Sequence, residues 1–265
     1  MDDPSLAGGL SIVIPAYNER DRLPRTLEAV DAWATGNGAV EVLILDDGST
    51  DGTAEVAEAW SARRRYVQSA RVLRRRHAGK GSAVAHGLLA SSANVRLFMD
   101  ADLAVPMEDV ARVAEAVRAG ADVAIGSRQL AGSWRTNEPE YRHIMGRVFN
   151  RMISTTVVRG IPDTQCGVKA FTAQAARHIF NRVRLYPADA PSVAKSRVTA
   201  FDVEVLAIAQ TLGLRIAQVP VRWSHVEVSK VRPLADPLRM LWDAVRVRLN
   251  LWRGAYGPRP ETRGR

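Results

Sequence analysis

The sequence of 265 residues has a single cysteine, Cys166, and only 6% aromatic residues. One cysteine excludes an intramolecular disulfide and is typical of a protein that works in a reducing compartment. No apolar run approaches the ~20 residues that a helix needs to cross a bilayer, and the first residues lack the apolar segment of a secretory signal. We therefore expect a cytoplasmic protein, which can also bind a membrane surface from the cytosolic side.

Several catalytic and cofactor motifs are missing as well. Gly79-Lys80-Gly81-Ser82 is not a Walker phosphate loop, because Arg75 stands where that loop needs a glycine. No Gly-x-Gly-x-x-Gly follows the first predicted strand, which argues against a dinucleotide cofactor. The histidines show no zinc-ligand spacing, and no nucleophile elbow is present. Zinc and acyl-transfer chemistry therefore have no support in the sequence.

The strongest positive pattern is the alternation of predicted strands and helices. Short apolar segments at residues 10–14, 40–45 and 95–99 each end in polar or turn residues. Between the first two, Leu23, Leu27 and Val30 recur at helical spacing, and a second helix is predicted from Thr53 to about Arg63. This order predicts an α/β fold with a Rossmann-like, mostly parallel sheet flanked by helices.

The predicted organisation is one large domain with a C-terminal extension. We expect a flexible N-terminus at 1–9, a catalytic domain at 10–225, an amphipathic helical region at 226–253 and a flexible basic tail at 254–265. In the extension, apolar residues from Leu234 to Trp252 recur at helical spacing beside several arginines. Such a helix can lie in a membrane interface or pack on the domain core.

The net charge of +9 predicts an anionic partner, which can be nucleic acid, lipid headgroups or a phosphorylated substrate. Aromatic residues that could stack on bases are few, and no nucleic-acid recognition motif is present. We therefore expect no nucleic acid among the partners. A basic module that binds nucleic acid or membranes without turnover is the alternative from a different class.

An acidic pair, Asp100 and Asp102, directly follows the predicted strand at 95–99. Residues two apart on a strand point to the same side, so both carboxylates can face one cation. Oxygen ligands of this kind suit Mg²⁺ or Mn²⁺, and such a cation could hold a diphosphate. The sequence thus predicts a metal site at the carboxyl edge of the sheet.

Two further segments suit a nucleotide. The turn from Asp46 to Gly52 combines glycines with acidic side chains that can accept hydrogen bonds from a base or a ribose. Lys80 is predicted in a flexible loop that runs into a helix from about Ser82 to Ser91, where it could approach the phosphates of the nucleotide.

Together, the segments 15–19, 46–52, 79–81 and 100–102 resemble the family 2 glycosyltransferases, which have the GT-A fold. The segments 126–128, 163–169, 201–204 and 219–223 further resemble the branch of dolichyl-phosphate or polyprenyl-phosphate β-glucosyltransferases. The resemblance extends over roughly residues 10 to 250, as judged by the order of the motifs.

The resemblance implies roles for individual residues on the donor side. It implies a uridine pocket lined by Pro15, Tyr17, Glu19 and Asp47, with Lys80 near it. It also implies that Asp102 binds the metal directly. Asp100 belongs to the same metal-binding motif, and the resemblance implies that it lies closer to the ribose or the sugar.

On the acceptor side, the resemblance implies that Arg128 and Arg142 receive the acceptor phosphate. It places Asp163, Gln165 and Lys169 in a loop beside the transferred sugar. Within that loop, Asp163 is the candidate for orienting the sugar or serving as a base.

The implied reaction moves glucose from UDP-glucose to a polyprenyl phosphate with inversion, which gives a β-linked product. A phosphate monoester with a second pKa near ~6 is already an anionic nucleophile at neutral pH, so a strong general base is unnecessary. Two alternatives remain open: transfer of mannose from GDP-mannose to the same kind of lipid, and transfer to a soluble phosphorylated acceptor.

Overall fold

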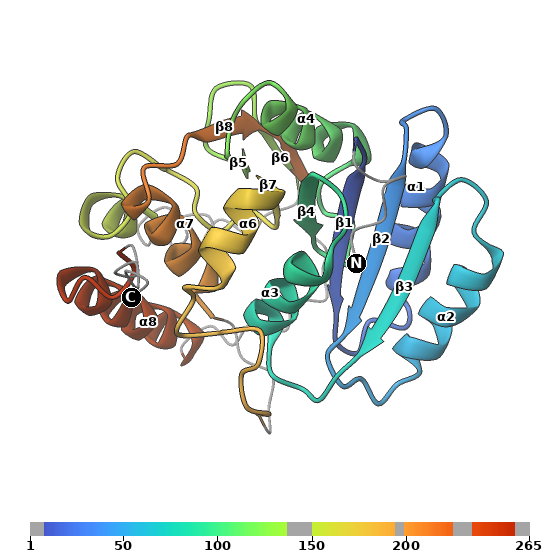
Figure 1. The fold of residues 1–265 in the computed structure, drawn as a ribbon, viewed down its shortest axis with the longest axis horizontal. Helices are drawn as coiled ribbons and strands as arrows, with labels where there is room; N and C mark the ends of the chain where they lie inside the picture. Colours follow the sequence, from blue (N-terminus) through green and yellow to red (C-terminus); the bar gives the residue numbers. More distant parts are fainter. Residues whose placement is uncertain (1–7, 137–149, 194–198, 225–234, 258–265) are drawn as a thin grey trace, which may run out of the picture.

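In a computed structural model of the chain, residues 8–136, 150–193, 199–224 and 235–257 are described. They form a seven-stranded sheet in the order β3-β2-β1-β4-β7-β5-β8, with helices on both faces (Figure 1). A separate two-stranded sheet pairs β6 with β9. The observed architecture confirms the predicted α/β fold with a mostly parallel sheet.

The first half of the chain alternates strictly between strands and helices. Its elements are β1 (Leu10–Ala16), α1 (Leu23–Ala34), β2 (Val40–Asp46), α2 (Thr53–Arg63), β3 (Ser69–Arg74), α3 (Lys80–Ala90) and β4 (Val95–Met99). Strands β1 to β4 are mutually parallel, so their carboxyl ends share one edge of the sheet. Lys80 is the first residue of α3 and therefore belongs to a helix, whereas the sequence predicted it in a flexible loop.

The second half departs from this alternation. Its elements are α4 (Met107–Arg118), β5 (Val123–Ser127), β6 (Trp134–Thr136), β7 (Val168–Thr172), α6 (Ala173–Phe180), α7 (Phe201–Thr211), β8 (Ile216–Pro220), β9 (Arg222–Ser224) and α8 (Ala235–Trp252). Strand β7 runs antiparallel to both of its neighbours, β4 and β5. The residues that enter β7 therefore lie at the edge where β4 ends.

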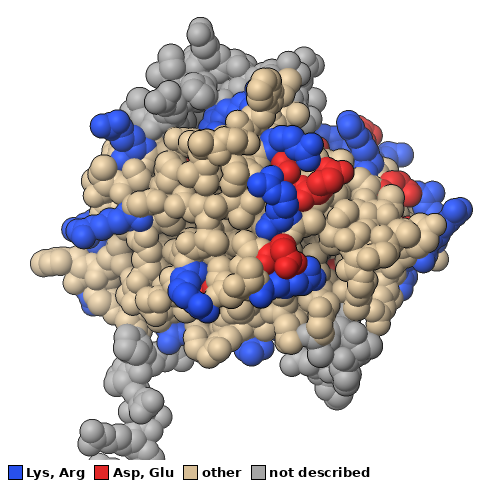
Figure 2. Space-filling view, turned by 90° about the horizontal axis from the view of Figure 1, so that it is seen from above, with Lys and Arg blue, Asp and Glu red and all other residues tan. Residues whose placement is uncertain are grey.

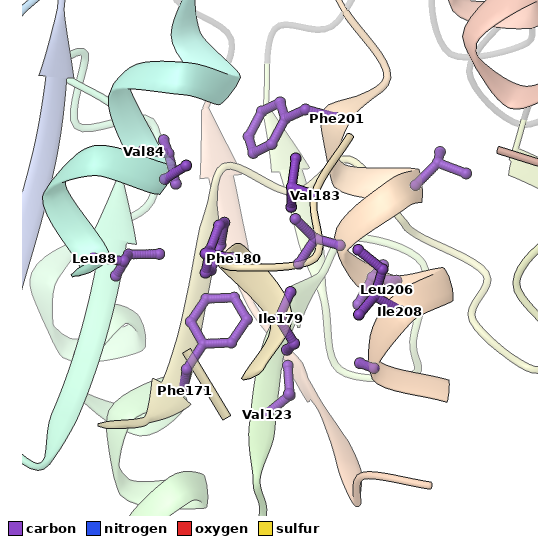
Figure 3. Close-up of a cluster of buried hydrophobic side chains, with 14 of the residues drawn as sticks. Val84, Leu88, Val123, Phe171, Ile179, Phe180, Val183, Phe201, Leu206 and Ile208 are labelled. Carbon is purple, nitrogen blue, oxygen red and sulfur yellow. The ribbon is translucent and has the colours of Figure 1, made fainter. Parts of the chain in front are cut away.

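The core is divided by the sheet into two apolar clusters. Figure 3 shows the cluster on one face, which includes Val84 and Leu88 of α3, Phe171 of β7 and Ile179 of α6. Helix α3 approaches β1 and β2 closely because Gly87 has no side chain: a Cβ there would lie 2.7 Å from Leu45 Cδ2. The close contact at Gly87 thus fixes α3 against the sheet, and the first residue of this helix is Lys80.

Helix α8 occupies most of the region predicted as an amphipathic extension. Ala244 and Val247 are buried in the same cluster as α7, so one face of α8 packs on the domain. Among the described residues, no helix is both long enough and apolar enough to cross a membrane.

Several exposed arginines are paired with acids. Arg74 contacts Glu55 and Glu58, and Arg63 contacts Glu28. On the face seen in Figure 2, Lys and Arg side chains lie in several separate places, some directly beside Asp and Glu. The positive charge on this face is therefore not gathered into one continuous patch.

Candidate active site

The acidic pair lies at the carboxyl end of β4, in contact with the start of α3. Asp100 Oδ1 is 2.5 Å from Lys80 Nζ, and Asp102 Oδ1 accepts a hydrogen bond from the backbone N–H of Ala104. Leu103 has a φ of 52°, a left-handed conformation that turns the chain sharply after the pair. The two carboxylates and Leu103 line a pocket together with Gly167 and Trp223.

The charges in this pocket suit a cation. Desolvation and the negative charge of Asp100 raise the pKa of Asp102 above its usual value. Desolvation lowers the pKa of Lys80, but Asp100, Asp202 and Asp102 raise it by more, so the ammonium group is favoured. A divalent cation bound by Asp100 and Asp102 would reduce the electrostatic repulsion between their two carboxylates. Among the described residues, no group of three or more His, Cys, Asp or Glu side chains could hold a metal.

Gly167 creates the space that Asp100 occupies. A Cβ built at Gly167 would overlap Asp100 Oδ2, and its next nearest atom would be Asp100 Cγ at 2.7 Å. The contact exists because β7 runs antiparallel to β4, which places the residue before β7 against the residue after β4. A glycine at 167 therefore permits the observed position of the Asp100 carboxylate.

Replacing Gly167 by alanine should displace Asp100 and lower the rate of the reaction catalysed in this pocket by about a hundredfold, because small misplacements of reacting groups carry a cost of that size. Thermal unfolding should change little if Asp100 can rotate toward solvent. Initial rates and a thermal melt measure the two effects. Gly8→Ala is the matched control, since no atom lies within 4 Å of a Cβ there. An alanine variant as active as the parent would show that the position of Asp100 is unimportant.

The predicted nucleotide side is built on β1 and β2. The rings of Tyr17 and His77 stack with centroids 3.9 Å apart. Asp47 is buried and holds the following loop, because it accepts hydrogen bonds from the backbone N–H groups of Ala78 and Gly79 and lies 2.7 Å from His77 Nδ1. The sequence analysis identified Tyr17 and Asp47 as residues of the nucleotide pocket. It did not identify His77, because no sequence motif around His77 indicates a binding role.

The two turns that follow β1 and β2 are joined by hydrogen bonds. Asn18, with a φ of 53°, donates from its backbone to Ser49 Oγ and accepts from the backbone of Thr50. The backbone N–H of Glu19 donates to Thr53 Oγ1, and its carboxylate pairs with Arg22. These contacts hold the segment from Pro15, which is part of β1, against the Asp46–Gly52 turn.

Arg128, at the end of β5, is held in place by Asp163 and Trp223. Asp163 is fully buried, and its two oxygens accept 2.8 Å hydrogen bonds from Arg128 Nε and Nη2. The Arg128 guanidinium also lies over the Trp223 ring, 5.4 Å from its centre. Trp223 lines the pocket that contains the acidic pair, so it connects Arg128 to that pocket.

The pairing decides the protonation of Asp163. Burial raises the pKa of Asp163, but the charge and hydrogen bonds of Arg128 lower it by more, to about 2. A carboxylate with such a low pKa is a weak base, and both of its oxygens are already engaged. The geometry therefore ties Asp163 to Arg128, where the sequence suggested that Asp163 orients the sugar or serves as a base, and its low pKa argues against the role of base.

Lys169 is also placed differently from the sequence expectation of a residue beside the sugar. Its side chain is 0% exposed, and Nζ lies 2.5 Å from Asp202 Oδ1 and 2.7 Å from the backbone oxygen of Cys166. The Lys169–Asp202 pair joins β7 to the start of α7. Gln165 is partly exposed in the loop before β7, and Cys166 is buried, which raises the pKa of its thiol to about 11.

Arg142, the second predicted phosphate-binding arginine, lies outside the described residues. The sequence analysis assigned no role to His77, and none to Gly167 or Trp223. Both belong to segments that carry the family resemblance, at 163–169 and 219–223, and that resemblance was the available signal.

Comparison with known proteins identifies the family of this chain. The family model described as "Glycosyl transferase family 2" matches residues 11–180, which include the acidic pair, Arg128 and Asp163. The chain belongs to this family and is a nucleotide-sugar-dependent glycosyltransferase.

Three curated relatives that are similar to this chain share one name. A dolichyl-phosphate beta-glucosyltransferase from Drosophila melanogaster is 34% identical, over 95% of this chain and 78% of the relative. Proteins of the same name from Dictyostelium discoideum and Homo sapiens are 33% and 30% identical, and this chain matches 76% and 77% of their lengths.

Solved structures support the fold. Glucosyl-3-phosphoglycerate synthase from Mycobacterium tuberculosis, crystallised with Mn²⁺, UDP and glucosyl-3-phosphoglycerate, aligns with a TM-score of 0.62 at 20% identity, over 94% of this chain and 81% of that one. A mannosyltransferase from Pyrobaculum calidifontis in complex with GDP-mannose and Mn²⁺ aligns with a TM-score of 0.60 at 18% identity, over 98% and 68% of the two chains. The chain therefore has the GT-A fold.

Proposed function

We propose that this protein transfers glucose from UDP-glucose to a polyprenyl phosphate at the cytosolic face of a membrane, with inversion at the anomeric carbon. The observation that carries the proposal is the pocket lined by the acidic pair and by Trp223, whose ring contacts the Arg128 guanidinium. The names of the curated relatives support glucose as the sugar and a dolichyl-type phosphate as the acceptor.

The donor side would use the residues on β1, β2 and β4. The stacked Tyr17 and the loop held by Asp47 would receive the nucleoside, in line with the UDP present in the Mycobacterium tuberculosis structure. Asp100 and Asp102 would hold Mg²⁺ or Mn²⁺, which neutralises the negative charge that builds on a departing diphosphate. Lys80, already beside Asp100, would pair with the same diphosphate.

On the acceptor side, Arg128 would pair with the lipid phosphate and align it with the sugar. A phosphate oxygen forms the new bond to the anomeric carbon, the bond from that carbon to the diphosphate oxygen breaks, and UDP leaves with the bonding electrons. Asp163 would act as a positioning residue, because it fixes the Arg128 guanidinium through two hydrogen bonds. The phosphate is already ionised, so no side chain has to remove a proton from it.

A radiolabelled transfer assay tests the proposal. UDP-glucose and GDP-mannose are each offered with Mn²⁺, together with either a polyprenyl phosphate or 3-phosphoglycerate, and the label is measured in the lipid and aqueous fractions. We expect label only in the lipid fraction and only from UDP-glucose. Transfer from GDP-mannose alone would overturn the donor, and transfer to 3-phosphoglycerate alone would overturn the acceptor.

A further inference from the structure

Helix α8 exposes a continuous row of large apolar side chains to solvent. This apolar stripe consists of Leu238, Leu241, Trp242, Val245, Leu249 and Trp252, all of them exposed. Trp242 is 63% exposed and Trp252 is 83% exposed, which are large values for tryptophan in a folded domain. At 3.6 residues per turn these six positions share one side of the helix.

The opposite side of α8 is already committed to the domain. Asp243 accepts a 2.7 Å hydrogen bond from Tyr186 Oη and one from the backbone N–H of Ala200, while Val247 is fully buried. Beyond the helix, Tyr256 donates to Glu204. The apolar stripe therefore cannot turn inward to pack on the core. Only contact with another surface would shield it from water.

The charges around the stripe indicate what that surface is. Arg246 and Arg253 flank the stripe on one side and Arg248 on the other, and all three are exposed. Within residues 238–253, whose side chains the structure describes, the one acidic residue is Asp243, which is buried on the core side. Apolar side chains with tryptophans, bordered by cations and free of exposed acids, complement an anionic lipid surface.

The buried face of α8, opposite the stripe, is connected to the active site. Tyr186, which donates to Asp243 of α8, packs against the start of α3, because a Cβ at Gly81 would lie 3.0 Å from Tyr186 Cβ. Gly81 directly follows Lys80, the partner of Asp100. A single side chain thus connects the helix that carries the stripe to the helix turn that carries Lys80.

We infer that the apolar stripe of α8 docks this protein onto anionic membranes, with the helix lying in the plane of the interface. Docking would not require α8 to leave the domain, because its buried face keeps its contacts with α7 and Tyr186. The inference rests on α8 alone and does not depend on the donor or the acceptor of the proposed reaction.

Co-sedimentation with vesicles tests the inference. The full chain is mixed with vesicles of phosphatidylcholine alone or of phosphatidylcholine with phosphatidylglycerol, at low and at high salt. We expect binding to the anionic vesicles that weakens as salt is added. The double variant Trp242→Ser/Trp252→Ser should bind about tenfold more weakly. The triple variant Arg246→Gln/Arg248→Gln/Arg253→Gln should lose about a hundredfold.

Matched controls separate docking from general effects. Trp134→Ser removes another tryptophan that is 71% exposed, and Arg25→Gln/Arg65→Gln/Arg177→Gln removes three exposed arginines outside α8. Both controls should bind vesicles like the parent, and near-ultraviolet circular dichroism should show that all variants are folded. Equal binding by the parent and the stripe variant, or no binding by the parent, would overturn the inference.

Two further measurements separate membrane docking from dimerisation and from sugar transfer. If ultracentrifugation shows a dimer that the tryptophan variant splits, and no form binds vesicles, the stripe joins two copies of the chain and the docking inference is overturned. UDP binding without vesicles should be unchanged in the stripe variants. Vesicle binding by a parent that transfers no sugar would uphold docking and overturn the proposed reaction instead.

Discussion

Replacing Asp102 by asparagine should lower sugar transfer by about a thousandfold, because the reaction would lose the charge that holds a cation at the diphosphate. Asparagine keeps the shape of the side chain and an oxygen that can accept from the N–H of Ala104. The substitution therefore removes charge and little else. UDP binding should also lose its dependence on Mn²⁺, which calorimetric titration with and without the metal measures.

The fold should tolerate this substitution. The pKa of Asp102 is raised by desolvation and by Asp100, so its ionised form is disfavoured in the folded protein, and a neutral side chain there should not lower the melting temperature. Glu115→Gln is a suitable control, because Glu115 is an exposed carboxylate on α4, 66% accessible in its ion pair with Arg118. If Asp102→Asn keeps more than about a tenth of the parent rate, the acidic pair is not the metal site.

Replacing Asp163 by asparagine should lower the free energy of unfolding by about 3 kcal/mol at neutral pH, because it leaves the guanidinium of Arg128 without its charge partner in a largely buried site. Urea unfolding measures this difference. Transfer should fall as well, since Arg128 would no longer be held over Trp223. Adding Arg128→Gln to the Asp163→Asn variant should recover part of the stability and none of the transfer.

The same pair predicts a pH dependence of stability. The pKa of Asp163 is lowered from 3.8 to about 2 in the folded protein, so the unfolded state binds the proton more readily. Its stabilising contribution is therefore complete above the unfolded pKa and is lost as the pH falls toward the folded one. A shift of this size corresponds to about 2 kcal/mol, and about half of it should be gone near pH 3. The stability difference between the parent and Asp163→Asn should shrink accordingly, and a difference that stays constant with pH would contradict the pairing.

The parts of this structure that could be predicted from sequence are those with local signals. Strands β1, β2 and β4 begin at Leu10, Val40 and Val95, where the predicted apolar segments begin, and α2 spans Thr53–Arg63 as expected. Parallel strands in a sheet of this class are buried on both faces, so they appear as continuous apolar runs. The acidic pair was recognisable because it follows such a run directly.

What the sequence did not predict depends on contacts between distant segments. Nothing local in Val168–Thr172 indicates that this strand runs antiparallel to its neighbours. For Lys169, the motif suggested a ligand contact, but its buried partner Asp202 lies on a helix 33 residues away. Asp163 is likewise defined by Arg128, a partner 35 residues distant. Pairings of this kind follow from tertiary structure and leave no periodic pattern.

The antiparallel position of β7 in the sheet leaves one edge of β4 exposed while the chain is being synthesised. Strand β4 emerges from the ribosome long before β7, and in the finished sheet β7 covers the side of β4 that faces away from β1. Until Val168–Thr172 has been synthesised, that side presents unpaired backbone amides and carbonyls, which are a template for pairing with other chains. Nascent or truncated chains that stop short of β7 should therefore be the aggregation-prone species of this protein.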